Sequence, residues 1–507
     1  MFAKVKSLGL IGMDAYLVEA EVDISRGLPR FDIVGLPDAS VSESKNRVRS
    51  AIRNSGFRFE EMRTTVNLAP ADLRKEGPIY DLPISVAMLV ATAQISALPE
   101  DIAFVGELSL DGEVRKINGV LPMVICARDS GIKEVYVPFE NSPEASVVDG
   151  VKVYPVKNIA QLADHLMKRT PIEPCKAFEI HSEEDEFLPD FADVKGQYHV
   201  KRALEIAAAG GHNTLMIGPP GSGKSMLAKR IPSILPDMTF EESLETTKIY
   251  SIAGAIPKGV SLITKRPFRS PHHTVSTAGL SGGGRIPHPG ELSLSHNGVL
   301  FLDELPEFSR ASMETMRQPV EDGVITISRV SGTLTYPCET MLVCAMNPCP
   351  CGYFGHPTKK CTCPQGAPAK YLSKVSGPLL DRLDIHIEVP QVEFSKLSAD
   401  EKGESSAEIK KRVDKARKLQ QKRFEGTPIK CNAKMSPSLT RQYCKIGEKE
   451  KAFLERSFEK LGLSARAYDK ILRVARTIAD LDGAENIELV HLTEAVQYRS
   501  LDRKFWK

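Results

Sequence analysis

The octapeptide GPPGSGKS, residues 218–225, has the residue types that a phosphate-binding loop requires. Apolar residues before it (NTLMI) and the segment MLAKRI after it predict that a strand leads into the loop and a helix follows it. Glycines let backbone N–H groups turn towards phosphate oxygens, while Lys224 would contact the β- and γ-phosphates and Ser225 would bind Mg²⁺. The pattern therefore predicts an ATP site, and its loop residues are Gly218, Pro219, Pro220, Gly221, Ser222, Gly223, Lys224 and Ser225.

Two further apolar stretches end in polar side chains. GVLFLDE ends in Asp303 and Glu304, and a strand here would place both carboxylates at the carboxyl edge of a parallel sheet, where ligands bind in open α/β folds. Asp303 would hold Mg²⁺ through water or Ser225, and Glu304 would orient or deprotonate the attacking water. The alternative is that the pair caps a following helix. The stretch MLVCAM ends at Asn347, whose side chain would hydrogen bond to the water or the γ-phosphate.

Four of the ten cysteines lie in two close pairs, Cys349, Cys351, Cys361 and Cys363. Four thiolates suit tetrahedral zinc, and the glycines, prolines and lysines between the pairs cannot form a hydrophobic core. We therefore expect a structural zinc knuckle inserted over residues 348–366. A redox pair or free thiols are the alternatives, and His356 could replace one ligand. Two other histidines, His272 and His273, are expected to make ordinary loop hydrogen bonds.

Length and composition predict several folded domains. The chain has 507 residues, of which 42% are hydrophobic and 26% charged. Its most apolar run, Leu82 to Leu98, is shorter than the ~20 residues of a membrane span, and the N-terminus lacks a signal-peptide core, which predicts a cytoplasmic protein without a membrane partner. From Glu401 onward, 25 lysines and arginines accompany 16 aspartates and glutamates, so this end either faces a polyanion or forms a solvated helix surface.

The pattern of strands and helices predicts three regions. Alternating polar and apolar residues from Ala15 to Ile24 indicate a half-buried strand, and helices and strands interleave through a first α/β domain over residues 1–170. Residues 171–192 are rich in proline and acidic side chains and are expected to form a linker. The phosphate loop lies in a second α/β domain, 193–392, and successive helical patterns predict a helical domain over 393–507.

The order of phosphate loop, acidic strand end, Asn347 and the segment GPLLDRLDI resembles that of AAA+ ATPases. Within them, FADVKGQYHVKRALEIAAAGGHN, PHPGELSLSHNGVLFLDELPEF and LSARAYDKILRVARTIADL are similar to the magnesium-chelatase-like branch, specifically the ComM (YifB) family. The resemblance covers nearly the whole chain. It implies an AAA+ core that carries the Cys-rich insertion, a helical lid and assembly into a ring, typically a hexamer. It also makes Asn347 the sensor-1 residue.

The same resemblance assigns roles to arginines. Arg382 would be the arginine finger, which acts on the γ-phosphate bound by the next subunit and makes hydrolysis depend on assembly. Arg466 would be the sensor-2 arginine of the lid, with Arg473 as a neighbouring alternative. The simpler reading of Arg382 is a surface salt bridge to Asp381 or Asp384.

The first domain is similar to the Lon protease domain through ADLRKEGPIYDLPISVAM and EVRKINGVLPMV. The position of the Lon catalytic serine is Ile79 here, and that of the lysine falls at about Leu121. Without a hydroxyl and an amine there is no Ser-Lys nucleophile to activate. Ser85 and Lys75 are nearby polar residues but do not occupy the matching positions. We therefore predict a protease-like fold without peptidase activity.

The leading functional hypothesis is a ring helicase or translocase that promotes branch migration during natural transformation, with single-stranded or branched DNA as partner. The segment VITISRVSGTLTYP predicts a hairpin, which in related helicases points into the pore. Arg329 on this hairpin and Arg285 in GLSGGGRIPHPGE would then contact phosphates. A chelatase-like motor that remodels a partner protein is the alternative, and an ATP-dependent protease is disfavoured by Ile79 and Leu121.

Overall fold

A computed structural model describes residues 1–176, 178, 189–284, 287–329, 332–392, 403–462, 464–501 and 505 of the protein. Half of the predicted linker, 171–192, lies outside these ranges. The chain forms two compact units. Unit 1 comprises Met1–Ser182, Phe240–Ile263 and Ser328–Tyr336, and unit 2 comprises Glu183–Thr239, Thr264–Ile327 and Pro337–Lys507. Among the described residues, no helix combines the length and the apolar character needed to cross a membrane.

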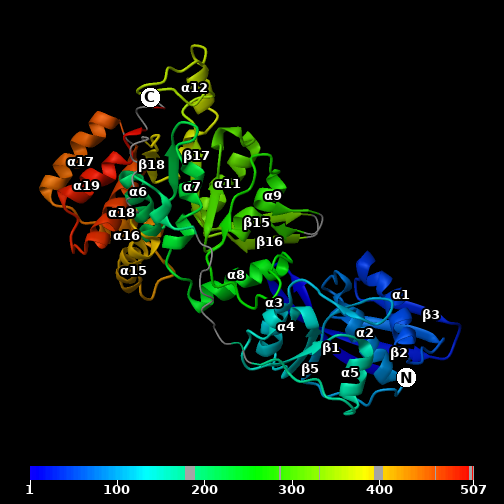
Figure 1. The fold of residues 1–507 in the computed structure, drawn as a ribbon. Coiled ribbons are helices and arrows are strands. Elements are labelled where there is room, and N and C mark those ends of the chain that lie inside the picture. The colour runs from blue at the N-terminus through cyan, green and yellow to red at the C-terminus, as the bar shows by residue number, and fades with distance from the viewer. Residues whose placement is uncertain are drawn as a thin grey trace. The chain divides into compact units, whose positions relative to one another are not determined.

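Unit 1 is built on a mixed seven-stranded sheet (Figure 1). In spatial order its strands are β3 (Arg30–Val34), β4 (Arg63–Ala69), β2 (Asp14–Ser25), β1 (Phe2–Ile11), β5 (Ile102–Phe104), β8 (Glu134–Pro138) and β9 (Lys152–Val156). Strands β1 and β2 are antiparallel with Phe2 opposite Asp23, and β2 is antiparallel to β4. Val18, Ala20 and Val22 of β2 are buried, which confirms the half-buried strand expected from the alternating pattern.

The helices of unit 1 pack on this sheet, apart from α8, which packs on α3. They are α1 (Ala39–Asn54), α2 (Asp81–Ala91), α3 (Val120–Asp129), α4 (Ser142–Ala145), α5 (Ile159–Leu166) and α8 (Phe240–Ile252). Helix α1 begins where the Asp38 side chain accepts a hydrogen bond from the Val41 N–H group, 2.7 Å away. Helix α8 follows the phosphate loop in sequence but belongs to unit 1, because it contacts α3 and its Ser251 carbonyl accepts from Gly119 N at 3.0 Å.

Unit 2 contains a five-stranded, fully parallel sheet (Figure 1). Its spatial order is β11 (Phe268–Arg269), β14 (Val299–Leu302), β17 (Met341–Met346), β10 (Thr214–Ile217) and β18 (Ile385–Glu388). Every residue of β10, β14 and β17 is buried, as expected for parallel strands covered on both faces. Since all strands run in one direction, the sheet has one carboxyl edge and one amino edge, and this polarity organises the site described below.

The remaining helices of unit 2 surround this sheet and continue into the helical C-terminal part. They are α6 (Tyr198–Gly210), α7 (Lys224–Ala228), α9 (Thr277–Ser281), α10 (Glu291–Leu294), α11 (Arg310–Asp322), α12 (Ala367–Leu372), α13 (Gly377–Leu380), α15 (Ser406–Arg423), α16 (Pro437–Tyr443), α17 (Glu448–Leu461), α18 (Ala465–Asp482) and α19 (Leu489–Gln497). Helices α15 and α18 pack on α6, and Leu204, Val413 and Ile478 share one hydrophobic core. The helical end and the strand core are therefore held together by apolar burial.

Smaller elements complete the described chain. Short strands are β6 (Glu107–Leu108), β7 (Val114–Arg115), β12 (Gly282–Gly283), β13 (His288–Pro289), β15 (Val324–Arg329) and β16 (Gly332–Pro337). The 3-10 turns are η1 (Pro78–Tyr80), η2 (Phe139–Asn141), η3 (Phe191–Asp193), η4 (Ile231–Ile234), η5 (Leu305–Glu307) and η6 (Asn432–Lys434). Strands β15 and β16 pair with each other and confirm the predicted hairpin. The side chain of Arg329 and all of Arg285 lie outside the described residues, so both remain predicted DNA contacts.

Candidate nucleotide-binding site

The phosphate loop joins the carboxyl end of β10 to the amino end of α7. Gly221 and Gly223 have φ values of 73° and 89°, in the left-handed region that glycine adopts without steric cost. At Gly218 a Cβ atom would lie 2.2 Å from the carbonyl oxygen of Val389. Side chains at these positions would therefore distort the loop, which explains why the sequence has glycines there.

Lys224 is 8% exposed and is held by oxygens at the mouth of the loop. Its Nζ donates to the carbonyl oxygens of Gly218 at 2.8 Å and Pro219 at 3.0 Å, and to Asn347 Oδ1 at 3.2 Å. Burial lowers the pKa of the Lys224 ammonium, although the carboxylates of Asp303 and Glu304 oppose this effect. The structure thus brings the predicted phosphate-binding lysine together with Asn347, the side chain that follows β17.

Ser225 and Asp303 form a set of oxygen ligands beside the loop. The Ser225 hydroxyl donates to Asp303 Oδ2, and Asp303 Oδ1 accepts from the backbone N–H of Glu304 at 2.9 Å. Hydroxyl and carboxylate oxygens are the ligands that Mg²⁺ prefers, and it commonly uses one or two of them together with phosphates. The residues present therefore fit the predicted magnesium site.

Glu304 has an unusual backbone conformation at the strand end. Its φ of 52° lies in the left-handed region, which costs a non-glycine residue on the order of 1 kcal/mol and is often found at functional sites. Its side chain is 57% exposed, and Oε2 lies 3.4 Å from Nδ1 of His273. Glu304 is the residue that precedes the 3-10 turn η5 (Leu305–Glu307), but its side chain makes no capping hydrogen bond there. The next α-helix, α11, is capped by the Ser309 side chain.

The contact between His273 and Glu304 was not predicted from the sequence. We expected ordinary loop hydrogen bonds for both histidines, and His272 does bond to Thr274 Oγ1 at 2.9 Å. His273 instead lies against His272, with 4.1 Å between ring centroids and the rings tilted by 34°, and its Nδ1 faces Glu304. The order of strands in the sheet would have predicted this contact. Because β11 pairs with β14, polar residues that follow these two strands meet at one edge of the sheet.

Arg382 lies in a different place, near the amino edge of the sheet. Its guanidinium donates to the carbonyl oxygens of Arg317 at 2.6 Å and Pro378 at 2.7 Å, and pairs with the carboxylate of Glu321. The acidic partner is thus Glu321 rather than the Asp381 or Asp384 of the alternative. The side chain keeps 18% of its surface exposed.

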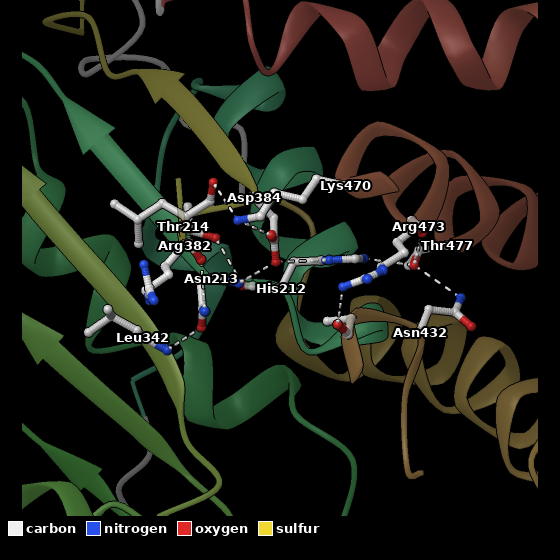
Figure 2. Close-up of polar contacts among 12 residues, drawn as sticks. His212, Asn213, Thr214, Leu342, Arg382, Asp384, Asn432, Lys470, Arg473 and Thr477 are labelled. Carbon is white, nitrogen blue, oxygen red and sulfur yellow. Dashed lines mark hydrogen bonds and ion pairs between the residues drawn. The ribbon is translucent and has the colours of Figure 1, made fainter. Parts of the chain in front are cut away.

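The two candidate lid arginines differ in whether the guanidinium is hydrogen bonded within the protein or exposed to solvent. Arg473 donates to the carbonyl of Ala433 at 3.1 Å and to Thr440 Oγ1 at 3.2 Å, so its guanidinium is bound within the helical part (Figure 2). Arg466 is 71% exposed, and its Nη1 lies 3.8 Å from Asp381 Oδ2. Arg466 therefore presents its guanidinium to solvent beside the Arg382 segment.

The sheet separates these arginines from the phosphate loop of the same chain. Asn213, which precedes β10, donates from Nδ2 to the Arg382 carbonyl at 3.0 Å (Figure 2). The loop begins at Gly218, at the other end of the strand, and five residue steps of β-strand span roughly 16 Å. Asp303 and Asn347 also follow their strands at the carboxyl edge. The phosphate-binding residues and the arginine segment thus occupy opposite edges of one sheet.

The four predicted zinc ligands converge. Their sulfurs all lie within 4.8 Å of one another, and Cys349 Sγ is 3.4 Å from Cys351 Sγ and 3.7 Å from Cys361 Sγ. A tetrahedral site with Zn–S bonds of about 2.3 Å implies sulfur separations of about 3.8 Å, so the cluster fits zinc. The Nδ1 atom of His356 accepts from the N–H groups of Thr358 and Lys359 in its own loop.

This Cys-rich insertion packs against the phosphate loop. A Cβ atom at Gly352 would lie 2.2 Å from Cδ of Pro220, and Gln391 donates to the Pro220 carbonyl at 3.1 Å. A folded knuckle therefore supports one side of the phosphate loop.

The Lon-like positions in unit 1 contain no serine-lysine pair. Ile79 and Leu121 are both buried and apolar. The Ser85 hydroxyl donates to the Asp81 carbonyl at 2.9 Å inside α2, and Lys75 Nζ donates to the carbonyl of Leu73 at 2.8 Å. Both polar side chains are thus occupied by backbone carbonyl groups rather than by each other.

Family models cover most of the chain. The model described as magnesium chelatase, subunit ChlI, matches residues 190–397. A second model of the ChlI subunit of Mg-chelatase matches 20–141, and a model of the ChlI C-terminal part matches 403–499. These matches include the phosphate loop, the Lon-like segment and the helical end.

Relatives of nearly equal length show to which family the chain belongs. The chain is 43% identical to the competence protein ComM of Haemophilus influenzae over 513 residues, covering 100% of this chain and 99% of that protein. It is 44% identical to the uncharacterized protein YifB of Escherichia coli, over 98% of this chain and 97% of that protein. The chain belongs to the ComM/YifB family. It is also 28% identical to Lon protease 2 of Bacillus subtilis over 131 residues, which are 26% of this chain and 23% of that protein.

Membership of the ComM/YifB family confirms the predicted fold class. The parallel sheet and the ChlI matches indicate an AAA+ core, the similarity to Lon protease 2 supports a Lon-like part, and helices α15 to α19 form the C-terminal end. The cysteine cluster lies between β17 and α12, as the insertion was expected to do.

Two substitutions should separate nucleotide binding from hydrolysis. Lys224→Ala removes the buried ammonium, and we expect loss of ATP binding or turnover. Glu304→Gln keeps the side-chain shape but cannot accept a proton, so ATP should bind while turnover falls by about 10²- to 10⁴-fold. Binding of a fluorescent ATP analogue and the steady-state ATPase rate measure the two effects. Equal turnover by the wild type and Glu304→Gln would contradict the role of Glu304.

Purified protein should contain about one zinc ion per chain, measured by elemental analysis. Cys361→Ser should lower the zinc content and, because Gly352 packs on Pro220, also weaken nucleotide binding. Cys126→Ser, at a half-buried cysteine outside the cluster, is the matched control and should change neither quantity. A protein that lacks zinc when purified under reducing conditions and does not take it up would show that the cluster is not a zinc site.

Proposed function

We propose that this protein is an ATP hydrolase that forms a ring and acts as a DNA helicase or translocase, promoting branch migration during natural transformation. The observation that carries the proposal is the division of the site between two edges of one sheet. The phosphate-binding and acidic residues lie at the carboxyl edge, and the exposed guanidinium of Arg466 and the Arg382 segment lie at the amino edge. The relative from H. influenzae is named a competence protein, which supports the cellular context.

Within one pocket, Lys224 binds the β- and γ-phosphates of ATP, and Ser225 and Asp303 hold Mg²⁺. The ion, when bound, neutralises charge that develops on the phosphate oxygens. Glu304 accepts a proton from the attacking water, and His273 holds the Glu304 carboxylate beside β14. Asn347 contacts Lys224 and orients the water or the γ-phosphate.

The arginines complete the pocket of a neighbouring subunit. Because roughly 16 Å of strand separates Asn213 from Gly218 in one chain, Arg382 and Arg466 serve a second copy more readily than their own loop. Their positive charge stabilises the transferring phosphoryl group, as arginine fingers do in related ATPases. A closed ring, which we propose to be a hexamer, gives every pocket such a neighbour.

The proposed roles follow the predicted segments. Residues 193–392 are the ATPase core, 393–507 the lid, and 1–170 a Lon-like domain without peptidase activity. The basic residues after Glu401 support an interaction with DNA, because lysines and arginines neutralise phosphates. Arg329 and Arg285 are proposed as further phosphate contacts, and the cytoplasm is the proposed location.

A chelatase-like motor that remodels a partner protein is the second candidate, and the three ChlI matches favour it. The two candidates share the ATPase site but differ in what stimulates it. DNA phosphates would stimulate a DNA motor and would leave a protein-remodelling motor unaffected.

DNA should therefore stimulate the ATPase rate. We expect single-stranded or branched DNA to raise turnover, and the apparent affinity to fall as salt increases, because counterions are released when basic residues bind phosphates. The measurement is the ATPase rate against a panel of DNA structures at several salt concentrations. No stimulation by any DNA at low salt would favour protein remodelling.

Mixed assemblies test whether Arg382 acts across an interface. Arg382→Ala alone should lower turnover by about 10³- to 10⁵-fold, as loss of an arginine finger does. Co-assembly with Glu304→Gln subunits should restore hydrolysis, since each variant supplies what the other lacks. Absence of recovery in proven mixed rings would count against the role of Arg382.

A further inference from the structure

Asp384 is a buried acidic residue between the strand core and the helical part of unit 2. It immediately precedes β18, two residues after Arg382, and its side chain is 11% exposed. Its Oδ1 lies 2.9 Å from Nζ of Lys470 on helix α18, and its Oδ2 lies 3.3 Å from Nδ1 of His212 (Figure 2). Burial alone would raise the pKa of the Asp384 carboxyl, but Lys470 and His212 lower it to well below the usual range. The group is therefore an ionised carboxylate.

The same group of contacts fixes helix α18. Lys470, itself 14% exposed, also approaches the carbonyl of Leu383 at 3.4 Å. About two turns further along α18 lies Thr477, whose Oγ1 is 2.8 Å from Nε2 of His212, on the other side of that ring. Arg466 stands one helical turn before Lys470 on the same helix. A single helix thus carries both the partner of Asp384 and the exposed arginine.

Asn213 fixes the Arg382 segment to the sheet. Its Oδ1 accepts from the backbone N–H of Leu342 in β17 at 2.8 Å, and its Nδ2 donates to the Arg382 carbonyl at 3.0 Å. Its own N–H donates to Asp384 Oδ2 at 3.2 Å. The amide therefore uses both ends of its side chain to hold the arginine segment at the start of β10 (Figure 2).

We propose that Asp384 is a positioning residue that joins α18 to the Arg382 segment, so that Arg382 and Arg466 are presented together to the pocket of the adjacent subunit. Lys470, His212 and Asn213 complete this joint. The inference rests on the proposed function, because it assumes that the arginines act across an interface. The contact between Arg466 and Asp381, at 3.8 Å, lies on the exposed side of the same junction and is consistent with a common orientation.

The joint orients the two arginines and does not contact the nucleotide bound by its own subunit. Asp384 lies at the amino edge of the sheet, whereas Lys224, Asp303 and Asn347 lie at the carboxyl edge. A substitution at Asp384 should leave nucleotide binding by the same subunit intact. It should impair only the hydrolysis of ATP bound by the adjacent subunit. Misplacement of catalytic groups by about 1 Å lowers turnover by about 10²-fold, which sets the expected size of the effect.

The test uses the full-length, assembled protein. Asp384→Asn should lower the ATPase kcat by about 10- to 100-fold while the affinity for a fluorescent ATP analogue changes less than about twofold. Co-assembly with Glu304→Gln subunits should restore turnover, because those subunits carry an intact joint and intact arginines. Lys470→Gln should behave in the same way, and the double variant should be no slower than either single variant, since both act through one pair.

Glu205→Gln is the matched control. Glu205 is another buried carboxylate between the strand core and the helical part. Among the described residues it pairs with Arg202 at 3.3 Å and with Arg412 of α15, and not with the arginine segment. Its loss should lower thermal stability without a turnover defect that Glu304→Gln subunits repair. If Asp384→Asn does not assemble, Lys470→Gln provides the same test from the lid side.

The outcomes separate this inference from the function on which it rests. Repair of both Asp384→Asn and Arg382→Ala by Glu304→Gln subunits supports the joint. Repair of Arg382→Ala alone, or full turnover by Asp384→Asn, overturns the positioning role and leaves the proposed function standing. If Arg382→Ala is not repaired in proven mixed rings, cross-subunit action itself fails and the inference fails with it.

Discussion

Strand β10 is the constraint on which the site depends. It lies between β17 and β18 in the sheet, with the phosphate loop at one end and Asn213 at the other. A strand cannot shorten, because each residue adds about 3.3 Å and every backbone group is bonded to its neighbours. Residues that bind the triphosphate and residues anchored at Asn213 are consequently kept apart in one chain, which is the basis of the proposed pocket shared between two chains.

Buried polar contacts, rather than apolar packing alone, set the orientation of the arginine segment. The hydrophobic core that α6 shares with α15 and α18 holds the helical part in place but is not directional. The ion pair of Asp384 and Lys470 and the amide of Asn213 impose specific geometry. Removing one partner of such a buried pair leaves an uncompensated charge, which is why conservative substitutions at Asp384 and Lys470 are the informative ones.

Since the pKa of Asp384 is depressed in the folded protein, the contribution of this carboxylate to stability is present at neutral pH. It is lost only as the pH falls through that lowered value.

Several parts of the site could be predicted because local sequence determines them. The glycines of the phosphate loop and the convergence of the four cysteines follow from residue type and spacing within short segments. The pairing of Ser225 with Asp303 could be predicted although they are far apart in sequence, because both follow strands of one parallel sheet and so meet at its carboxyl edge. The contact between His273 and Glu304 could not be predicted in this way, because it depends on β11 lying beside β14 and on a left-handed φ at Glu304. The pairing of Arg382 with Glu321, and the grouping of α8 with unit 1, likewise depend on tertiary packing between segments far apart in sequence.

The most direct test of the two-chain pocket is the ATPase rate per subunit over a dilution series, with the assembly state measured by light scattering at each concentration. If neighbouring subunits share each pocket, the rate per subunit should fall in parallel with dissociation of the ring and recover when the protein is concentrated again. Full turnover by isolated monomers, unchanged at every concentration, would contradict it.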